Sequence, residues 1–120
     1  MEGVAFALKD CLNVAIENGF VPSKVTVCGG GAKSKVWLQI LADILNLPIA
    51  ILTTEQGPAY GAAIFAMVGY GQYESVESAT QSFTKIKNSI IPDKKQSAIY
   101  IEKYKVFRNL YPILKKVISA

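Results

Sequence analysis

The residues best suited to chemistry form a glycine-rich turn in the first third of the sequence. Three glycines, Gly29–Gly31, separate the apolar run Val25–Cys28 from Lys33 and Ser34. Glycine permits positive φ and leaves no side chain between the backbone and a ligand. Free N–H groups at the start of the following helix favour an anion or a polar nucleotide group. The pattern predicts a ligand site, although strand-to-helix turns also use glycine for structural reasons alone.

Two phosphate-binding motifs fit this turn only in part. A P-loop ends in Gly-Lys-Ser/Thr, but here Ala32 precedes Lys33, and Val27 occupies the place of the first glycine. The dinucleotide pattern GxGxxG lacks its third glycine, because Ser34 stands at that position. Glu55 follows the next apolar segment and could replace the acidic residue that binds ribose in dinucleotide folds. A dinucleotide site therefore remains an alternative.

The segments around the turn alternate between helices and short apolar strands. Hydrophobic periodicity predicts helices over 2–18, 34–46 and 59–68, and strands over 25–28 and 49–52. Short apolar strands that alternate with helices indicate a parallel sheet covered on both faces. We therefore expect an α/β fold in which only two strands form the sheet.

Spacing also predicts how the helices pack. In the first helix, apolar residues recur at i, i+4, i+7 and i+8. The predicted buried face contains Val4, Leu8, Cys11, Leu12 and Ala15, and the predicted solvent face contains Lys9, Asn13 and Glu17. Trp37 shares a stripe with Ile40 and Ile44, which favours core packing over stacking on a ligand. Gly57 and Gly61 predict close packing of the third helix in a soluble core.

Charge divides the chain into two parts. Residues 1–83 hold four basic and seven acidic residues, a net of −3, and residues 84–120 hold nine basic and two acidic, a net of +7. We interpret 1–83 as a folded unit and 84–120 as a basic extension whose helix packs on the same domain. That helix is predicted to begin near Ser97 and to be kinked or interrupted at Pro112. A basic helix with aromatic residues could bind nucleic acid, but its aromatic residues share one stripe, which favours a solvated basic face.

Composition excludes several classes of protein. No histidine is present, so a Ser-His-Asp triad, a Cys-His dyad and a histidine-ligated metal are excluded within this chain. Cys11 and Cys28 form no CxxC motif, and two such separated cysteines are typical of a protein in the reducing cytosol. A single disulfide between them remains an alternative. The apolar run 62–68 is far shorter than the ~20 residues that span a bilayer. The first residues of the sequence include the acidic Glu2 and lack the basic region with which a signal peptide begins. The sequence thus predicts a cytoplasmic chain with no membrane or nucleic-acid partner.

Several separated segments, in the same order, resemble the C-terminal domain of the FGGY carbohydrate kinases, and most closely the xylulokinase branch. The glycine turn and the helix after it, Gly29–Ile44, carry the strongest resemblance. Glu2–Asp10 is similar to the helix that precedes the turn in that family, and Gln56–Ala63 to its glycine- and alanine-rich helix. The tyrosine-bearing segment Tyr100–Pro112 is similar to its C-terminal helix.

The resemblance implies a fragment of an actin-like (ribonuclease-H-like) ATPase domain, with a short parallel sheet and flanking helices. It further implies a two-domain ATP-dependent sugar kinase that binds ATP in the cleft between its domains, with Mg²⁺ bridging the phosphates. The glycine turn corresponds to the family's adenosine motif. The residues implied to lie close to the adenine and ribose, or to flank them, are Gly29, Gly30, Gly31, Ala32, Ser34 and Lys35.

The rest of the active site has no counterpart in this sequence. In the family, the catalytic aspartate, the sugar pocket, the main phosphate loops and three antiparallel strands all precede this region. We therefore assign no catalytic residue, expect Mg²⁺ to be held mainly by the missing N-terminal part, and expect the chain alone to be inactive. A helix that begins at Glu2 without a cap also fits a fragment. Two strands would leave sheet edges open, so we expect a homo-oligomer or binding to the missing part.

The sugar is not determined by these residues. The resemblance favours D-xylulose, with gluconate, ribulose or glycerol as alternatives and ATP or ADP as the nucleotide. A hypothesis of another class is a stand-alone nucleotide- or coenzyme-binding module without kinase activity.

Overall fold

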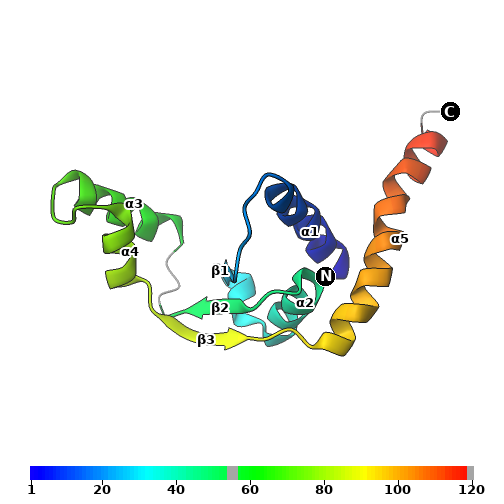
Figure 1. The fold of residues 1–120 in the computed structure, drawn as a ribbon, viewed down its shortest axis with the longest axis horizontal. Coiled ribbons are helices and arrows are strands. Elements are labelled where there is room, and N and C mark those ends of the chain that lie inside the picture. Colours follow the sequence, from blue (N-terminus) through cyan, green and yellow to red (C-terminus); the bar gives the residue numbers. More distant parts are fainter. Residues whose placement is uncertain (54–56, 119–120) are drawn as a thin grey trace.

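The computed structural model describes residues 1–53 and 57–118. Figure 1 shows helices packed around a small sheet at the centre, with a helical hairpin at one end and a long helix at the other. Along the chain, the elements are α1 (Glu2–Glu17), β1 (Val25–Val27), the 3₁₀ turn η1 (Gly30–Lys33), α2 (Lys35–Leu45), β2 (Ile49–Leu52), α3 (Pro58–Gly69), α4 (Val76–Phe83), β3 (Ile86–Ile90) and α5 (Lys94–Ile118).

The sheet has the strand order β1-β2-β3. β1 and β2 are parallel, with Val25 opposite Ile49, as the apolar strands predicted. β3 is antiparallel to β2, with Ile90 opposite Ile49, so the expectation of only two strands is wrong. The sequence of β3, Ile-Lys-Asn-Ser-Ile, is polar in the middle, and such residues suit an edge strand that is mostly exposed. A hydrophobic pattern could not reveal it.

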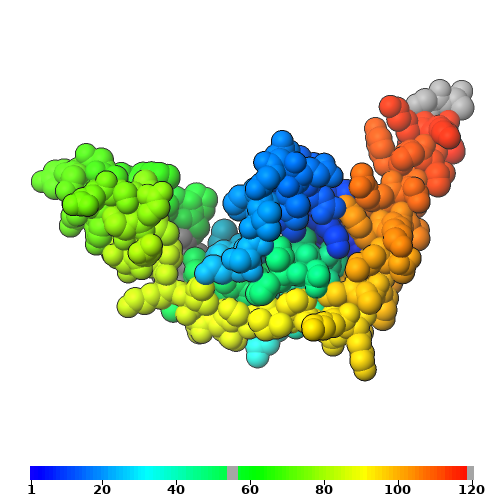
Figure 2. Space-filling model, viewed as in Figure 1, coloured from blue at the N-terminus to red at the C-terminus, as the bar shows by residue number. Residues whose placement is uncertain are grey.

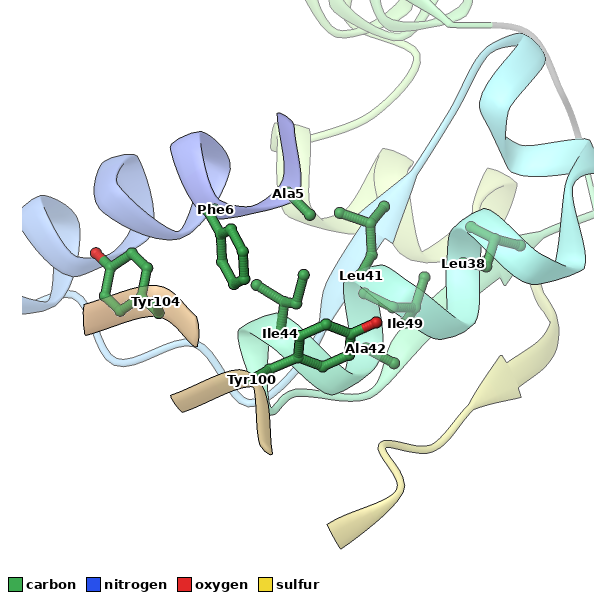
Figure 3. Close-up of a cluster of buried hydrophobic side chains, with 9 residues drawn as sticks. All are labelled: Ala5, Phe6, Leu38, Leu41, Ala42, Ile44, Ile49, Tyr100 and Tyr104. Carbon is green, nitrogen blue, oxygen red and sulfur yellow. The ribbon is translucent and has the colours of Figure 1, made fainter. Parts of the chain in front are cut away.

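The core lies where α1 and α5 cover α2. It consists of Ala5, Phe6, Leu38, Leu41, Ala42, Ile44, Ile49, Tyr100 and Tyr104. Figure 3 shows the Phe6 ring extending from α1 toward Ile44, with the two tyrosines of α5 beside it. The Phe6 ring centroid lies 6.0 Å from that of Tyr100 and 5.8 Å from that of Tyr104. Aromatic side chains bury large apolar areas, so this cluster is the main attachment of α5 to the domain.

The buried face of α1 is not the predicted one. Val4 is 61% exposed and Leu8 45% exposed, whereas Phe6 is buried. On the face expected to meet solvent, the Lys9 Nζ donates to the Ile44 carbonyl at 2.7 Å. The Asn13 amide on that face donates to the Tyr104 hydroxyl at 3.0 Å. Both faces of α1 carry apolar residues, and aromatic side chains about 90 positions away decide which face is covered.

α5 begins at Lys94, a few residues earlier than predicted. The Asp93 carboxylate accepts hydrogen bonds from the backbone N–H groups of Lys95 and Gln96 and so caps the helix. Pro112 lies inside α5 and does not interrupt it, contrary to one of the two expected outcomes. The second half of α5 extends beyond the body of the domain, as Figure 1 shows.

α3 and α4 form the hairpin at the other end. Pro58 occupies the first turn of α3, and the Ser75 hydroxyl accepts the Ser78 N–H and so caps the start of α4. The Tyr60 hydroxyl donates to the Phe83 carbonyl at 3.2 Å and joins the two helices. A Cβ built on Gly61 would meet nothing within 4 Å, so the close packing predicted there is wrong. Figure 2 shows the hairpin standing apart from α1, with a hollow between them.

Candidate functional site

The glycine turn is a single tight bend that leads into η1. Gly29 has φ 83° and ψ −169°, a combination that is essentially restricted to glycine. The Gly29 carbonyl accepts the Ala32 N–H at 3.0 Å, and the Gly31 carbonyl accepts the Ser34 N–H at 3.1 Å. All three glycines are exposed. The bend therefore presents bare main chain at the surface.

The glycines differ in what surrounds them. A Cβ on Gly31 would lie 3.1 Å from both Cδ1 and Nε1 of Trp37, so the Trp37 ring occupies the space beside it. A Cβ on Gly30 would meet nothing within 4 Å, and the backbone of Gly30 does not have positive φ. Of the three glycines in the turn, Gly29 and Gly31 thus have a structural reason to be glycine, whereas the described surroundings of Gly30 give it none.

The start of α2 fixes the far end of the turn. The Ser34 hydroxyl accepts the Trp37 N–H at 3.3 Å and caps the helix, while Lys35 is the first helical residue and is exposed. Trp37 and Ile40 pack against the core and Ile44 is fully buried, which confirms the predicted core role of this stripe.

A cleft of about 290 Å³ lies at the carboxyl ends of β1 and β2. Its lining residues are Val27, Cys28, Gly29, Ala32, Lys33, Lys35, Leu38, Ile51, Leu52, Thr53, Lys87 and Asn88. Of the predicted site residues, Gly29, Ala32 and Lys35 are brought together here. Gly30, Gly31 and Ser34 belong to the same turn but do not line the cleft. In doubly wound α/β proteins, ligands bind in such crevices outside the carboxyl ends of the strands.

Sequence reasoning missed the part of the cleft contributed by β3. Lys87 and Asn88 line it, and they lie in the strand that the hydrophobic pattern did not reveal. The available signal was weak, namely the isoleucines at both ends of β3 and the proline shortly after it.

Three lysines line the cleft, and no carboxylate does so among residues 1–53 and 57–118. Glu55, the acidic residue proposed for ribose, falls outside the described residues. Asp43 is 4% exposed and accepts hydrogen bonds from the Gln39 amide at 2.8 Å and the Asp93 N–H at 2.7 Å. It therefore joins α2 to the start of α5.

Four titrating groups with shifted pKa values lie where α1 packs against α5. Burial, followed by a hydrogen bond to Glu2, raises the pKa of Tyr100. Burial and a hydrogen bond to Asp10 likewise raise the pKa of Tyr104. The hydrogen bond from Tyr100 lowers the pKa of Glu2, and burial lowers the pKa of Lys9. These shifts belong to the packing of α5.

Other site classes find no support in the described residues. No group of three or more Asp, Glu, Cys or His side chains there could hold a metal ion. Cys11 and Cys28 are both free and exposed, so they form no disulfide with one another. No helix within the described ranges has the length and hydropathy to cross a bilayer.

Comparison with known proteins identifies relatives along the whole chain. Residues 1–70 match the model of the FGGY family of carbohydrate kinases, C-terminal domain. A xylulose kinase from Staphylococcus epidermidis is 35% identical over 117 residues, which cover 98% of this chain and 24% of that protein. A ribulokinase from Geobacillus thermodenitrificans is 34% identical over 117 residues, covering 92% of this chain and 21% of that protein. The chain thus spans about a quarter of the length of these relatives.

The structural comparison agrees with the sequence comparison. The crystal structure of a xylulose kinase from Rhodospirillum rubrum superposes with a TM-score of 0.82 at 30% identity, over 99% of this chain and 24% of that one. The expected α/β fold, a fragment of an actin-like ATPase domain, is confirmed, with the addition that the small sheet is mixed. The order of elements, the glycine turn and these similarities lead to one conclusion: the chain belongs to the FGGY family of carbohydrate kinases, as a C-terminal domain.

Proposed function

We propose that this chain forms the adenosine-binding wall of an ATP-dependent sugar kinase, which transfers the γ-phosphoryl group of ATP to a sugar hydroxyl. The observation that carries the proposal is the glycine turn itself. Its backbone is exposed, and the adjoining cleft lies at the carboxyl ends of two parallel strands. Ligands of open α/β sheets bind at such positions.

Each predicted residue has a place in this proposal. The backbone of Gly29–Ala32 would lie against the adenine and ribose, since no side chain at Gly30 keeps a flat ring away. Ser34 and Lys35 would flank the nucleotide at the start of α2. The lysines of the cleft favour the negative charge of the phosphates.

Phosphoryl transfer itself needs groups that this cleft does not supply. Mg²⁺ prefers oxygen ligands, chiefly carboxylates and substrate phosphates. The described lining of the cleft offers lysines and no carboxylate, so its donor set does not fit the ion. We therefore place the metal ion, the catalytic base and the sugar pocket in the part of the protein outside this chain, and we propose that the chain alone is inactive.

The proposed sugar is D-xylulose. Support comes from the similarity to a xylulose kinase over 98% of the chain. The 34% identical ribulokinase keeps ribulose as an alternative, and gluconate and glycerol remain alternatives as well.

Calorimetric titration tests the proposal. ATP, ADP and NAD are titrated into the chain alone and into the chain joined to the upstream region of a sugar kinase. We expect weak or absent binding to the chain alone, and binding dominated by adenosine when the two parts are joined. Preferential binding of NAD would favour the stand-alone coenzyme-binding module instead.

Gly30→Val provides the matched variant. We expect it to abolish nucleotide affinity while leaving the helix content intact, because a Cβ at this position meets nothing within 4 Å. Nucleotide binding that survives the substitution would show that the turn is merely structural.

A further inference from the structure

β3 departs from regular pairing beside the cleft. Asn88 is paired with Ile51, but the next pair joins Leu52 to Ile86, so Lys87 is an extra residue without a partner in β2. In a regular strand, successive side chains point to opposite faces. Here the consecutive residues Lys87 and Asn88 both line the cleft. A β-bulge re-aims side chains in this way, and bulges are frequent next to active sites.

The lysines of the cleft come from different elements. Lys87 lies on β3, while Lys33 and Lys35 lie on η1 and at the start of α2. Neither Lys35 nor Lys87 forms an ion pair with any carboxylate in the described part of the chain. Positive groups that line one concave surface raise the local concentration of anions.

The remaining lining suits a ligand with an apolar and a polar part. Val27 and Ile51 contribute apolar surface, and Thr53 contributes a hydroxyl group, which donates to the Lys85 carbonyl at 3.2 Å and can still accept. The Asn88 Oδ1 accepts the Ser89 N–H at 2.8 Å, which leaves the Asn88 amide NH₂ as a donor. Apolar walls with a few polar groups are typical of small-molecule sites.

We propose that Lys87 binds a phosphate group of the nucleotide whose nucleoside lies against the glycine turn. This inference rests on the proposed function and adds a second wall to the site. β3 lies across β2 from β1, so the nucleotide would extend over the sheet edge from the glycine turn to the bulge.

Protection of Cys28 from alkylation measures the binding. Cys28 is exposed and lines the cleft, whereas Cys11 lies on α1 away from it and serves as an internal control. In the chain joined to the upstream region, adenosine and ADP are titrated and the alkylation rate of each cysteine is read by mass spectrometry. We expect Lys87→Ala to weaken protection by ADP about fivefold and to leave protection by adenosine unchanged.

Two further variants separate a specific contact from net charge. Lys87→Arg keeps the charge and should retain ADP affinity. Lys85→Ala removes the same charge two residues away, at an exposed position that does not line the cleft, and should bind ADP as the unsubstituted chain does. The difference between Lys87→Ala and the unsubstituted chain should shrink as salt is added, because salt screens exposed charges.

The possible failures are distinguishable. Unchanged ADP affinity in Lys87→Ala, or an equal loss in Lys85→Ala, overturns the role of Lys87 while the glycine turn remains the nucleoside site. If neither adenosine nor ADP protects Cys28 in the unsubstituted joined protein, the proposed function itself fails and the role of Lys87 fails with it.

Discussion

The three glycines of the turn should respond differently to the same small substitution. An alanine at Gly29 would have to adopt φ 83° and ψ −169°, a region that costs residues other than glycine on the order of 1–3 kcal/mol. For a chain of this size, a loss of about 2 kcal/mol lowers the unfolding midpoint by roughly 8 °C. Gly29→Ala should therefore reduce stability.

Gly30→Ala should leave stability nearly unchanged and should weaken nucleotide binding. The new Cβ meets nothing within 4 Å, and the backbone needs no positive φ, so the stability change should stay within about 0.5 kcal/mol. Nucleotide affinity should nevertheless fall by about tenfold or more, which corresponds to about 1.4 kcal/mol, because the methyl group enters the space proposed for the ligand. Gly31→Ala should lie between the two, since the Trp37 ring at 3.1 Å must move slightly.

Thermal unfolding of the chain, followed by circular dichroism, measures stability, and calorimetric titration of ADP into the joined protein measures affinity. Stability and affinity should separate along the turn, with stability lost at Gly29 and affinity lost at Gly30. Gly30→Ala that unfolds as early as Gly29→Ala, or that binds ADP with full affinity, would refute it.

Three other predictions concern the rest of the fold. Light scattering of the chain alone should give a mass above the 13.0 kDa of a monomer. The reason is that α1 leaves apolar side chains exposed and the sheet edges leave backbone groups unpaired. A stable monomer would count against this prediction. Asp43→Ala should lower the free energy of unfolding by about 2 kcal/mol, because the Asp93 N–H loses its acceptor. The control variant Glu74→Ala, at an exposed position, should change the free energy of unfolding little. Equal effects of the two variants would contradict the role of Asp43 in joining α2 to α5. Folding raises the pKa values of Tyr100 and Tyr104, so the unfolded chain loses these two phenolic protons at lower pH than the folded chain does. The contribution of the two tyrosines to stability is therefore complete below about pH 10 and is lost as the pH rises further. Tyrosinate absorbance should lose its component at highest pH in the double variant Tyr100→Phe, Tyr104→Phe, and an unchanged titration profile would contradict that assignment.

Features encoded by neighbouring residues could be predicted from the sequence. The parallel strands β1 and β2, the caps at Ser34 and Ser75, and Pro58 at the start of α3 all follow from local rules and are present in the structure. The glycine turn was located in the same way, because a strand, a tight bend and a helix start are contiguous in the chain.

Features that depend on distant partners could not be predicted. The face of α1 that is buried depends on the aromatic residues of α5, and both faces of α1 carry apolar side chains. β3 is a polar edge strand, so its pairing with β2 leaves little trace in hydropathy. Lys87 and Asn88 were therefore missed as site residues, since their position follows from that pairing and from one irregular register step.

The attachment of α5 also bears on how the protein is made. The carboxylate of Glu2 accepts the Tyr100 hydroxyl, and Phe6 is covered by side chains from the same distant helix. During synthesis, Phe6 leaves the ribosome about a hundred residues before its aromatic partners do. Contacts of such long sequence separation form late, and a nascent chain keeps apolar surface open until then. Chaperone binding to newly made chains should therefore include α1 and should decline only after α5 has emerged from the ribosome.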